Sequence, residues 1–284
     1  NTMANTLDTA LVPNTVADRV VTTLGKRLAT LGVFASDFST DLMDPKRPFS
    51  IPIVTDGSTT LINATDFEQG DSTITTSLVT PKQITQSFHI TNAELQSGHN
   101  LERLVEKNAQ KFAEAIMREA LTPLTAATYT NTPIVAATPV DLDTGDLQDL
   151  WGGLSNSDSK ALILNGSYYA KQIPQSNDDF TLADGYMGFD AVRMNNEFGG
   201  AETNVVGFAA GSDALAFAAR VPAQTSAVTD GMLSSQVIVL PELGIPVQVN
   251  MWASLQSRET WMSFDVCFGA IEADVDALTL IKSA

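Results

Sequence analysis

The stretch NLERLVEKNAQKFAEAIMREAL occupies residues 100–121 and predicts one long amphipathic helix. Asn100 is expected to cap it, and Thr122-Pro123 ends it because proline has no amide hydrogen for the next helical bond. At 1.5 Å per residue the helix would be a rod of about 33 Å. Its apolar residues recur at intervals of three and four and therefore share one face: Leu101, Leu104, Val105, Ala109, Phe112, Ala113, Ile116, Met117, Ala120 and Leu121.

A polar, strand-forming stretch precedes this helix. It begins with FSIPIV at residues 49–54 and is expected to return through ITQSFHI at residues 84–90. Pro52 and Pro81 indicate an edge structure, since proline is tolerated in sheets only at edges and bulges. Too few apolar residues lie between positions 55 and 77 to form a core, and an isolated two-stranded arm is marginal in water. The arm must lie on its own chain or on another copy, and the second option points toward assembly. The only apolar residues between positions 55 and 77 are Leu61, Ile62, Ala64, Phe67 and Ile74.

A second amphipathic helix is expected over residues 14–31, upstream of the arm. Asn14 or Thr15 could cap its start. Arg19, Lys26 and Arg27 would lie on its polar side. The sequence leaves two interpretations of this helix open, because it could pack against the body of its own chain or reach a neighbouring copy.

The composition describes a folded, acidic protein. Apolar residues make up 44% of the chain, the formal net charge is −17, and no apolar run is long enough to span a membrane. No secretory signal is visible at the amino-terminus. The single Cys267 excludes an intrachain disulfide and fits a reducing compartment.

The acidic residues are concentrated in the second half of the chain. Residues 1–140 contain 10 Lys and Arg against 14 Asp and Glu, whereas residues 141–284 contain 6 against 19. No basic stripe is present to neutralise phosphates, so sequence-specific nucleic-acid binding is not expected. The acidity either favours solubility alone or prevents adhesion to a polyanion beside which the protein resides.

The second half mixes helices and strands, which indicates an α+β class. Residues 125–145 are interpreted as a domain connection and residues 175–204 as a long surface loop. A helix is expected at 144–154, with Thr144 as its N-cap. A strand is expected at 160–165, with a second helix after it, and a third helix is expected at 214–220. Further strands are expected at 207–211, 236–240, 245–251, 259–268 and 277–281.

Enzyme signatures fail on their physical requirements. Ser157 and Lys160 have the spacing of a serine–lysine pair, but they lead into a strand and no companion motif is present. The run DLDTGD at 141–146 lacks the glycine and glutamate that a calcium loop needs. His89 and His99 have no cysteine partners for zinc, and Cys267 lies in an apolar run. We therefore predict no catalytic, cofactor-binding or metal-binding residues, and no enzyme activity.

The order of these parts resembles the major capsid (coat) protein of tailed double-stranded DNA bacteriophages. The resemblance begins with MANTL at 3–7 and covers nearly the whole chain. It includes the amphipathic helix, the polar arm, the long helix from Asn100 and the acidic second half. Four later phrases are similar: KALILNGSYYA at 160–170, GFAAGSDALAFAAR at 207–220, LGIPV at 243–247 and FGAIEADVDALTL at 268–280.

The resemblance implies a virion shell subunit made of four parts. Residues 1–47 would form an amino-terminal arm and helix, and residues 48–88 an extended loop over a neighbouring subunit. A peripheral domain with the spine helix would comprise 89–140 and 257–284, and an axial domain 141–256. Hexamers and pentamers would close an icosahedral capsid around double-stranded DNA, which they enclose without sequence-specific binding.

The implied partners are further copies of the chain, scaffolding protein, portal and a decoration protein, with assembly in the host cytoplasm and no membrane. No lysine–asparagine pair for a covalent crosslink can be identified. Copies with a net charge of −17 repel, so apolar and edge contacts must be complemented by local cations. The residues expected to contact other subunits are Arg19, Arg27, Lys46, Arg47, Phe67 and Lys82.

Three alternatives stay open. The first is an encapsulin-type nanocompartment shell, which resembles the same fold but encloses cargo enzymes. The second is an unrecognised hydrolase, with Ser157 and Lys160 as its first candidate residues. The third is an acidic tail or appendage protein.

Overall fold

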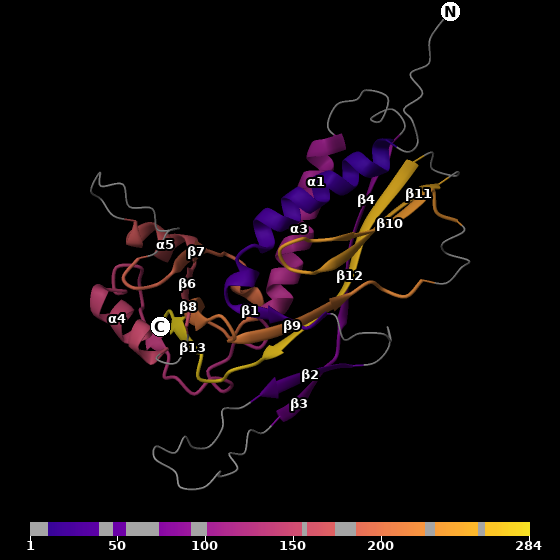
Figure 1. Ribbon diagram of the computed structural model, residues 1–284. Coiled ribbons are helices and arrows are strands. Elements are labelled where there is room, and N and C mark those ends of the chain that lie inside the picture. Colours follow the sequence, from indigo (N-terminus) through magenta and orange to yellow (C-terminus); the bar gives the residue numbers. More distant parts are fainter. Residues whose placement is uncertain are drawn as a thin grey trace, which may run out of the picture.

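The computed structural model describes residues 11–39, 48–54, 74–91, 101–154, 158–173, 186–224, 231–254 and 259–284. These residues form two sheets, a two-stranded hairpin and four helices, which Figure 1 shows as a sheet with two crossing helices beside a second, smaller body. The helices are α1 (Leu11–Leu28), α3 (Leu101–Ala120), α4 (Thr144–Gly153) and α5 (Gly166–Gln172), with short 3-10 turns η1 (Leu31–Val33) and η4 (Phe198–Gly200).

The predicted long helix is confirmed as α3. The predicted amino-terminal helix is confirmed as α1, but neither Asn14 nor Thr15 caps it, because the helix already begins at Leu11. Pro13 lies in its first turn, where the missing amide hydrogen has no intrahelical partner to lose. α1 packs against α3 within the same chain, as Figure 1 shows.

The larger sheet has six strands. Its path runs β1 (Ala35–Asp37), β9 (Leu215–Arg220), β12 (Glu259–Glu272), β11 (Pro246–Ser254) and β10 (Ser234–Val239), and β4 (Lys82–Thr91) pairs with the other side of β12. β1 is parallel to β9, and the other pairs are antiparallel. β4 was expected to be the return limb of the arm. Instead, its ten residues pair with Glu259–Phe268, at an edge of the described sheet.

The predicted helix at residues 214–220 is wrong, because this segment is β9. All six residues of β9 are buried, and the strand pairs with β1 on one side and β12 on the other. A strand covered on both faces has an apolar run without alternation, which periodicity cannot distinguish from a buried helix.

The smaller sheet has five strands in the order β5 (Ile134–Val135), β13 (Leu278–Lys282), β8 (Val205–Gly211), β6 (Lys160–Leu164) and β7 (Ala191–Met194). The predicted strand at 160–165 is confirmed as β6, with all five residues buried, and the helix after it as α5. The expected loop at 175–204 is partly wrong, since β7 pairs in parallel with β6. β7 has only four residues and is flanked by Asp190 and Asn195, so it was not recognisable as a strand in the sequence.

α4 covers this smaller sheet, and its N-cap is Asp143 instead of Thr144. The Asp143 carboxylate accepts a hydrogen bond from the Asp146 amide at 3.0 Å, and the Asp146 carboxylate accepts one from the Asp143 amide at 3.3 Å. This reciprocal capping box satisfies amides that the first helical turn leaves unpaired.

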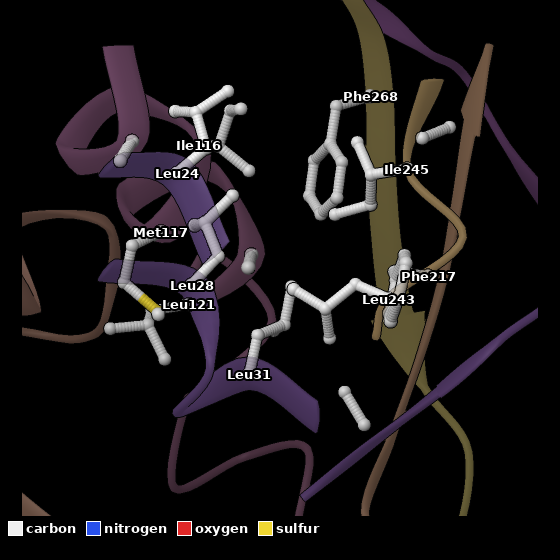
Figure 2. Close-up of a cluster of buried hydrophobic side chains, with 14 of the residues drawn as sticks. Leu24, Leu28, Leu31, Ile116, Met117, Leu121, Phe217, Leu243, Ile245 and Phe268 are labelled. Carbon is white, nitrogen blue, oxygen red and sulfur yellow. The ribbon is translucent and has the colours of Figure 1, made fainter. Parts of the chain in front are cut away.

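The main hydrophobic core lies between α1, α3 and the six-stranded sheet and continues to the inner side of the smaller sheet. Figure 2 shows Leu24, Leu28 and Ile116 from the two helices opposite Phe268 of β12 and Ile245, which directly precedes β11. A second core lies between α4, α5 and the outer side of the five-stranded sheet. The long helix α3, which we call the spine helix, therefore supplies the central packing surface of the main core.

Candidate assembly surfaces

The base of the arm is a hairpin of β2 (Phe49–Val54) and β3 (Ile74–Val79). Ile51 and Val79 are buried against Ala216 and Ala218 of β9 in the same chain. On the opposite side of β3, Ile74 and Leu78 are 64% and 68% exposed. The hairpin is thus held by its own chain on one face and presents apolar side chains on the other.

The tip of the arm lies outside the described residues, which end at Val54 and resume at Ile74. The proposed contact residue Phe67 belongs to that segment. Lys46 and Arg47, the proposed cations at the start of the arm, also lie outside the described residues.

Two other proposed contact cations form ion pairs within the chain. Arg19 on α1 pairs with Glu102 on α3 at 2.5 Å, and both side chains are more than half exposed. Lys82 on β4 pairs with Glu119 on α3 at 2.7 Å. Exposed ion pairs of this kind contribute at most about 1 kcal/mol each to stability.

Arg27 lies in a polar groove of about 220 Å³ between α1, α3 and the segment after β7. Neither Arg27 nor the neighbouring Lys26 forms an ion pair with any residue that the structure describes. Glu197 lines the same groove but pairs with Arg118 at 3.0 Å. Of the six proposed contact residues, Arg27 is the described one whose charge is not already paired.

Lys160, the lysine of the hydrolase alternative, is held by contacts with Trp151. Its ammonium donates a hydrogen bond to the Trp151 carbonyl at 3.0 Å and lies 3.7 Å from the centroid of the Trp151 ring. The residue is buried at the start of β6. Ser157 lies outside the described residues, so the structure does not bring the two side chains together.

Cys267 on β12 is half-buried beside Arg220 of β9, its partner in the strand register. Burial raises the pKa of the Cys267 thiol, and the Arg220 guanidinium opposes this rise. A raised pKa disfavours the thiolate, which is the nucleophilic form. This environment is that of a structural cysteine.

Possible metal ligands do not gather in one place in the described ranges. No group of three or more His, Cys, Asp or Glu side chains there could hold a metal ion. The His89 ring lies beside that of Trp261, with centroids 4.8 Å apart and planes inclined by 35°, and His99 is not described. No helix among the described residues is long and apolar enough to cross a membrane.

Sequence reasoning missed one exposed surface, on the six-stranded sheet. Val237 and Val239 of β10 and Leu233 just before it are each more than half exposed. Trp252 and Trp261 stack side by side on β11 and β12. Strand alternation would have placed these side chains on one face, but the sequence does not say which face the helices cover.

Compared by sequence, the chain matches no protein-family model and no curated protein. Solved structures are similar in three dimensions. A virus-like particle from Pyrococcus furiosus matches with a TM-score of 0.55 and 11% identity, over 93% of this chain and 98% of that one. The capsid of Cyanophage P-SCSP1u matches with a TM-score of 0.56 and 11% identity, over 88% and 86%. The capsid of an empty GTA particle matches with a TM-score of 0.56 and 14% identity, over 92% and 90%.

These matches confirm the fold implied by the resemblance, which is the α+β fold of tailed-phage capsid proteins. Each covers most of this chain and most of the other, so the likeness includes both sheets and the spine helix. At such low identity it concerns the arrangement of the backbone alone.

Proposed function

We propose that this chain is a structural, non-enzymatic subunit that self-assembles as hexamers and pentamers into an icosahedral capsid around double-stranded DNA. The observation that supports the proposal most is the match to capsid structures along nearly the full length of both chains. A fold alone does not imply a function. Here, however, an extended arm with an exposed apolar side and a strongly acidic chain add independent support.

The subunit would consist of four parts. The amino-terminal arm at 1–47 and the extended loop at 48–88 would contact neighbouring copies. The peripheral domain would comprise residues 89–140 and 257–284, with α3, and the axial domain residues 141–256, with α4 and α5. In the sheets the two ranges are connected by strand pairing, since β11 of the range 141–256 pairs with β12 of the range 257–284. Likewise β13, within 257–284, pairs with β8 of the range 141–256.

The acidity of the chain suits a wall beside packed DNA. Cations on the inner wall would bind phosphates and hold the genome, whereas carboxylates do not. The partners that we propose are scaffolding protein, a portal and a decoration protein, and assembly takes place in the host cytoplasm. The mature location is the virion capsid.

The second candidate is an encapsulin-type nanocompartment shell. The match over 98% of the virus-like particle from Pyrococcus furiosus supports a closed shell that need not be a phage capsid. A hydrolase has less support, since the Lys160 ammonium is engaged with the Trp151 carbonyl and ring.

Electron microscopy of the expressed protein, with and without a scaffolding protein, tests the proposal. Closed icosahedral shells are expected, and a protein that stays monomeric under all conditions would contradict it. Nuclease treatment of shells purified from infected or expressing cells separates the two candidates. Protected double-stranded DNA supports the capsid, and enclosed enzyme with no protected DNA supports the nanocompartment.

The cations at the start of the arm provide a more local test. We propose that Lys46 and Arg47 meet acidic residues of a neighbouring copy, and that Arg27 and Phe67 also contribute contacts. The double charge reversal Lys46→Glu, Arg47→Glu is expected to lower particle yield at least several-fold without changing the melting temperature of the free subunit. Normal particle yield from this variant would exclude the two residues as essential contacts.

A further inference from the structure

One face of the six-stranded sheet points away from the helices. Phe88, Met262 and Phe264 belong to the core with α3, and side chains alternate along a strand, so the intervening residues face the other side. We call this side of β10, β11, β12 and β4 the outer sheet face. Figure 1 shows α1 and α3 on the opposite side of these strands.

An aromatic row crosses the outer sheet face near the end of the β11–β12 pair. Trp252, Trp261 and His89 are direct partners in the strand register. The two indole rings are stacked, with centroids 6.2 Å apart and planes inclined by 14°, and His89 follows at 4.8 Å. The row is partly exposed, and two of the three tryptophans of the chain lie in it. Tryptophan is enriched among the residues that dominate binding energy in protein interfaces.

The polar rows beside the aromatic row can be covered at little cost. The Asp265 carboxylate accepts hydrogen bonds from Thr85 and Ser263 hydroxyls at 2.6 Å each and from the Asn250 amide at 2.9 Å. Asn250 accepts one from the Ser235 hydroxyl at 2.8 Å. Asn250, Ser263 and Asp265 are already buried in the subunit and bond to each other, so a partner that covers them adds little cost. The exception in these rows is the Gln248 side-chain oxygen, which is buried without a hydrogen-bond partner among the described residues.

The outer sheet face is nearly free of charge in a chain that carries 33 acidic residues. Its carboxylates are Asp265, which is hydrogen-bonded within the sheet, and Glu259 at the rim, 4.0 Å from His89. The exposed face of α3, in contrast, alternates acidic and basic residues. Copies with a net charge of −17 repel each other, so a surface whose described residues include only two carboxylates is where two of them can approach most easily.

The area of the outer sheet face fits one of several contacts that a subunit makes with its neighbours. Four strands and four rows of side chains cover roughly 19 Å by 26 Å, which is on the order of 500 Å². A stable two-protein interface buries about 800 Å² on each partner. The face is therefore too small to hold an isolated dimer alone, but it suits a subunit that touches several copies at once.

We propose that the outer sheet face is an interface with a second copy of this chain, with the row of Trp252, Trp261 and His89 as its energetic centre. The exposed side chains of Leu233, Val237 and Val239 extend this interface along β10. The inference rests on the proposed shell function and deepens it by naming the surface through which subunits meet.

Tryptophan fluorescence tests the proposal directly. In a Trp151→Phe variant, only Trp252 and Trp261 report. Assembled shells are expected to show emission shifted to the blue and acrylamide quenching several-fold weaker than free subunits. Shells in which the two tryptophans are quenched as strongly as in free subunits would overturn the inference and leave the proposed function intact.

A matched pair of variants tests the same face without disturbing the core. Val237→Glu adds a charge to the outer sheet face, whereas Val135→Glu adds one to an equally exposed valine on the edge of the other sheet. We expect shell yield to fall at least tenfold for the first variant and to stay unchanged for the second. Equal yields from both would overturn the inference.

Failure of the shell function gives a different result. If the wild-type chain forms no shells, sedimentation at increasing concentration still measures its self-association. Association that Val237→Glu abolishes would uphold the interface and refute the shell. Absence of association at any concentration would refute both.

Discussion

At the scale of single residues, tertiary partners decided which charges are free. Glu114 and Arg118 are four residues apart on α3, a spacing that favours an ion pair on a helix. In the structure Arg118 pairs instead with Glu197 from the segment after β7, at 3.0 Å. Arg19 and Lys82, which the sequence offered as contacts between subunits, likewise pair with Glu102 and Glu119 of their own chain. The sequence shows which residues are cations, but it does not show which carboxylates the fold brings close enough to pair with them.

Glu202 links three segments that are distant in the sequence. Its carboxylate accepts a hydrogen bond from the Ala126 amide at 2.5 Å and pairs with Lys282 of β13 at 2.7 Å. The amide bond from Ala126, followed by the Lys282 ammonium, holds the pKa of Glu202 below its ordinary value. The folded state therefore favours the charged form of this carboxyl.

We predict that Glu202→Gln destabilises the protein at neutral pH but not in acid. A lowered pKa in the folded state contributes stability above the ordinary pKa of glutamate, and that stability is lost as the pH falls through the folded value. The difference in urea midpoint between wild type and variant should be constant near pH 7 and shrink below about pH 4.5. Glu242→Gln, at an exposed turn, is the control. A difference that persists unchanged at pH 3 would contradict the assignment.

Cys267 should be a slow nucleophile. Because burial raises the pKa of its thiol, a smaller fraction is thiolate at any given pH than in a free cysteine. Iodoacetamide at pH 8 is expected to alkylate the folded protein more slowly than N-acetylcysteine, and the urea-unfolded protein at the free rate. Alkylation of the folded protein as fast as the free thiol would show that Cys267 is activated.

At the scale of elements, α3 positions the rest of the subunit. Its buried face meets α1 and the six-stranded sheet, and its carboxyl end meets η4 before the smaller sheet. The contact at that end is very close. A Cβ atom on Gly200 would lie 1.7 Å from the Arg118 carbonyl oxygen, so only glycine fits where η4 crosses the helix.

Gly200→Ala is predicted to destabilise the protein by more than about 2 kcal/mol, because backbone must move to relieve the overlap. Gly152→Ala is the matched control. Gly152 lies in α4 with open space around its Cβ position, so alanine there should gain up to about 1 kcal/mol. Urea unfolding of both variants provides the measurement. Equal stability of the two would refute the close approach.

Segments with clear periodicity or buried runs were predictable as elements. α1, α3, β6 and the four C-terminal strands follow from apolar patterns and breaker residues, within a few positions at their ends. β9 was not predictable, because its run of buried alanines beside phenylalanine fits a helix as well as a doubly covered strand. Only the strands on either side of it select the extended form.

At the scale of the whole molecule, the two parts of the arm have different roles: its base packs on the subunit, and its tip is proposed to contact other copies. Ile51 and Val79 anchor its base on β9. The sequence of residues 55–73, which lie outside the described residues, carries too few apolar side chains for a core of its own. Folding and assembly should therefore depend on different parts of the arm.

Replacing residues 55–73 with Asn-Gly tests this separation. Val54 and Ile74 are direct partners in the strand register, and Asn-Gly favours the tight turn that joins such strands. The shortened chain is expected to keep the melting temperature of the free subunit within a few degrees and to form no shells. Circular dichroism and electron microscopy provide the two measurements. Shells at normal yield would mean that the arm does not join subunits.

The α3 helix, the α+β class, the polar arm and the acidic second half could all be predicted from the sequence. They depend on local patterns and on composition, which can be read without knowing the fold. The pairing of β4 with the main sheet, the extended form of β9 and the ion pairs of Arg19 and Lys82 became known only from the three-dimensional fold. The same holds for the row of two tryptophans and a histidine on the outer sheet face. Strand order and register set such outcomes, because they bring together residues whose distance along the chain says nothing about their distance in space.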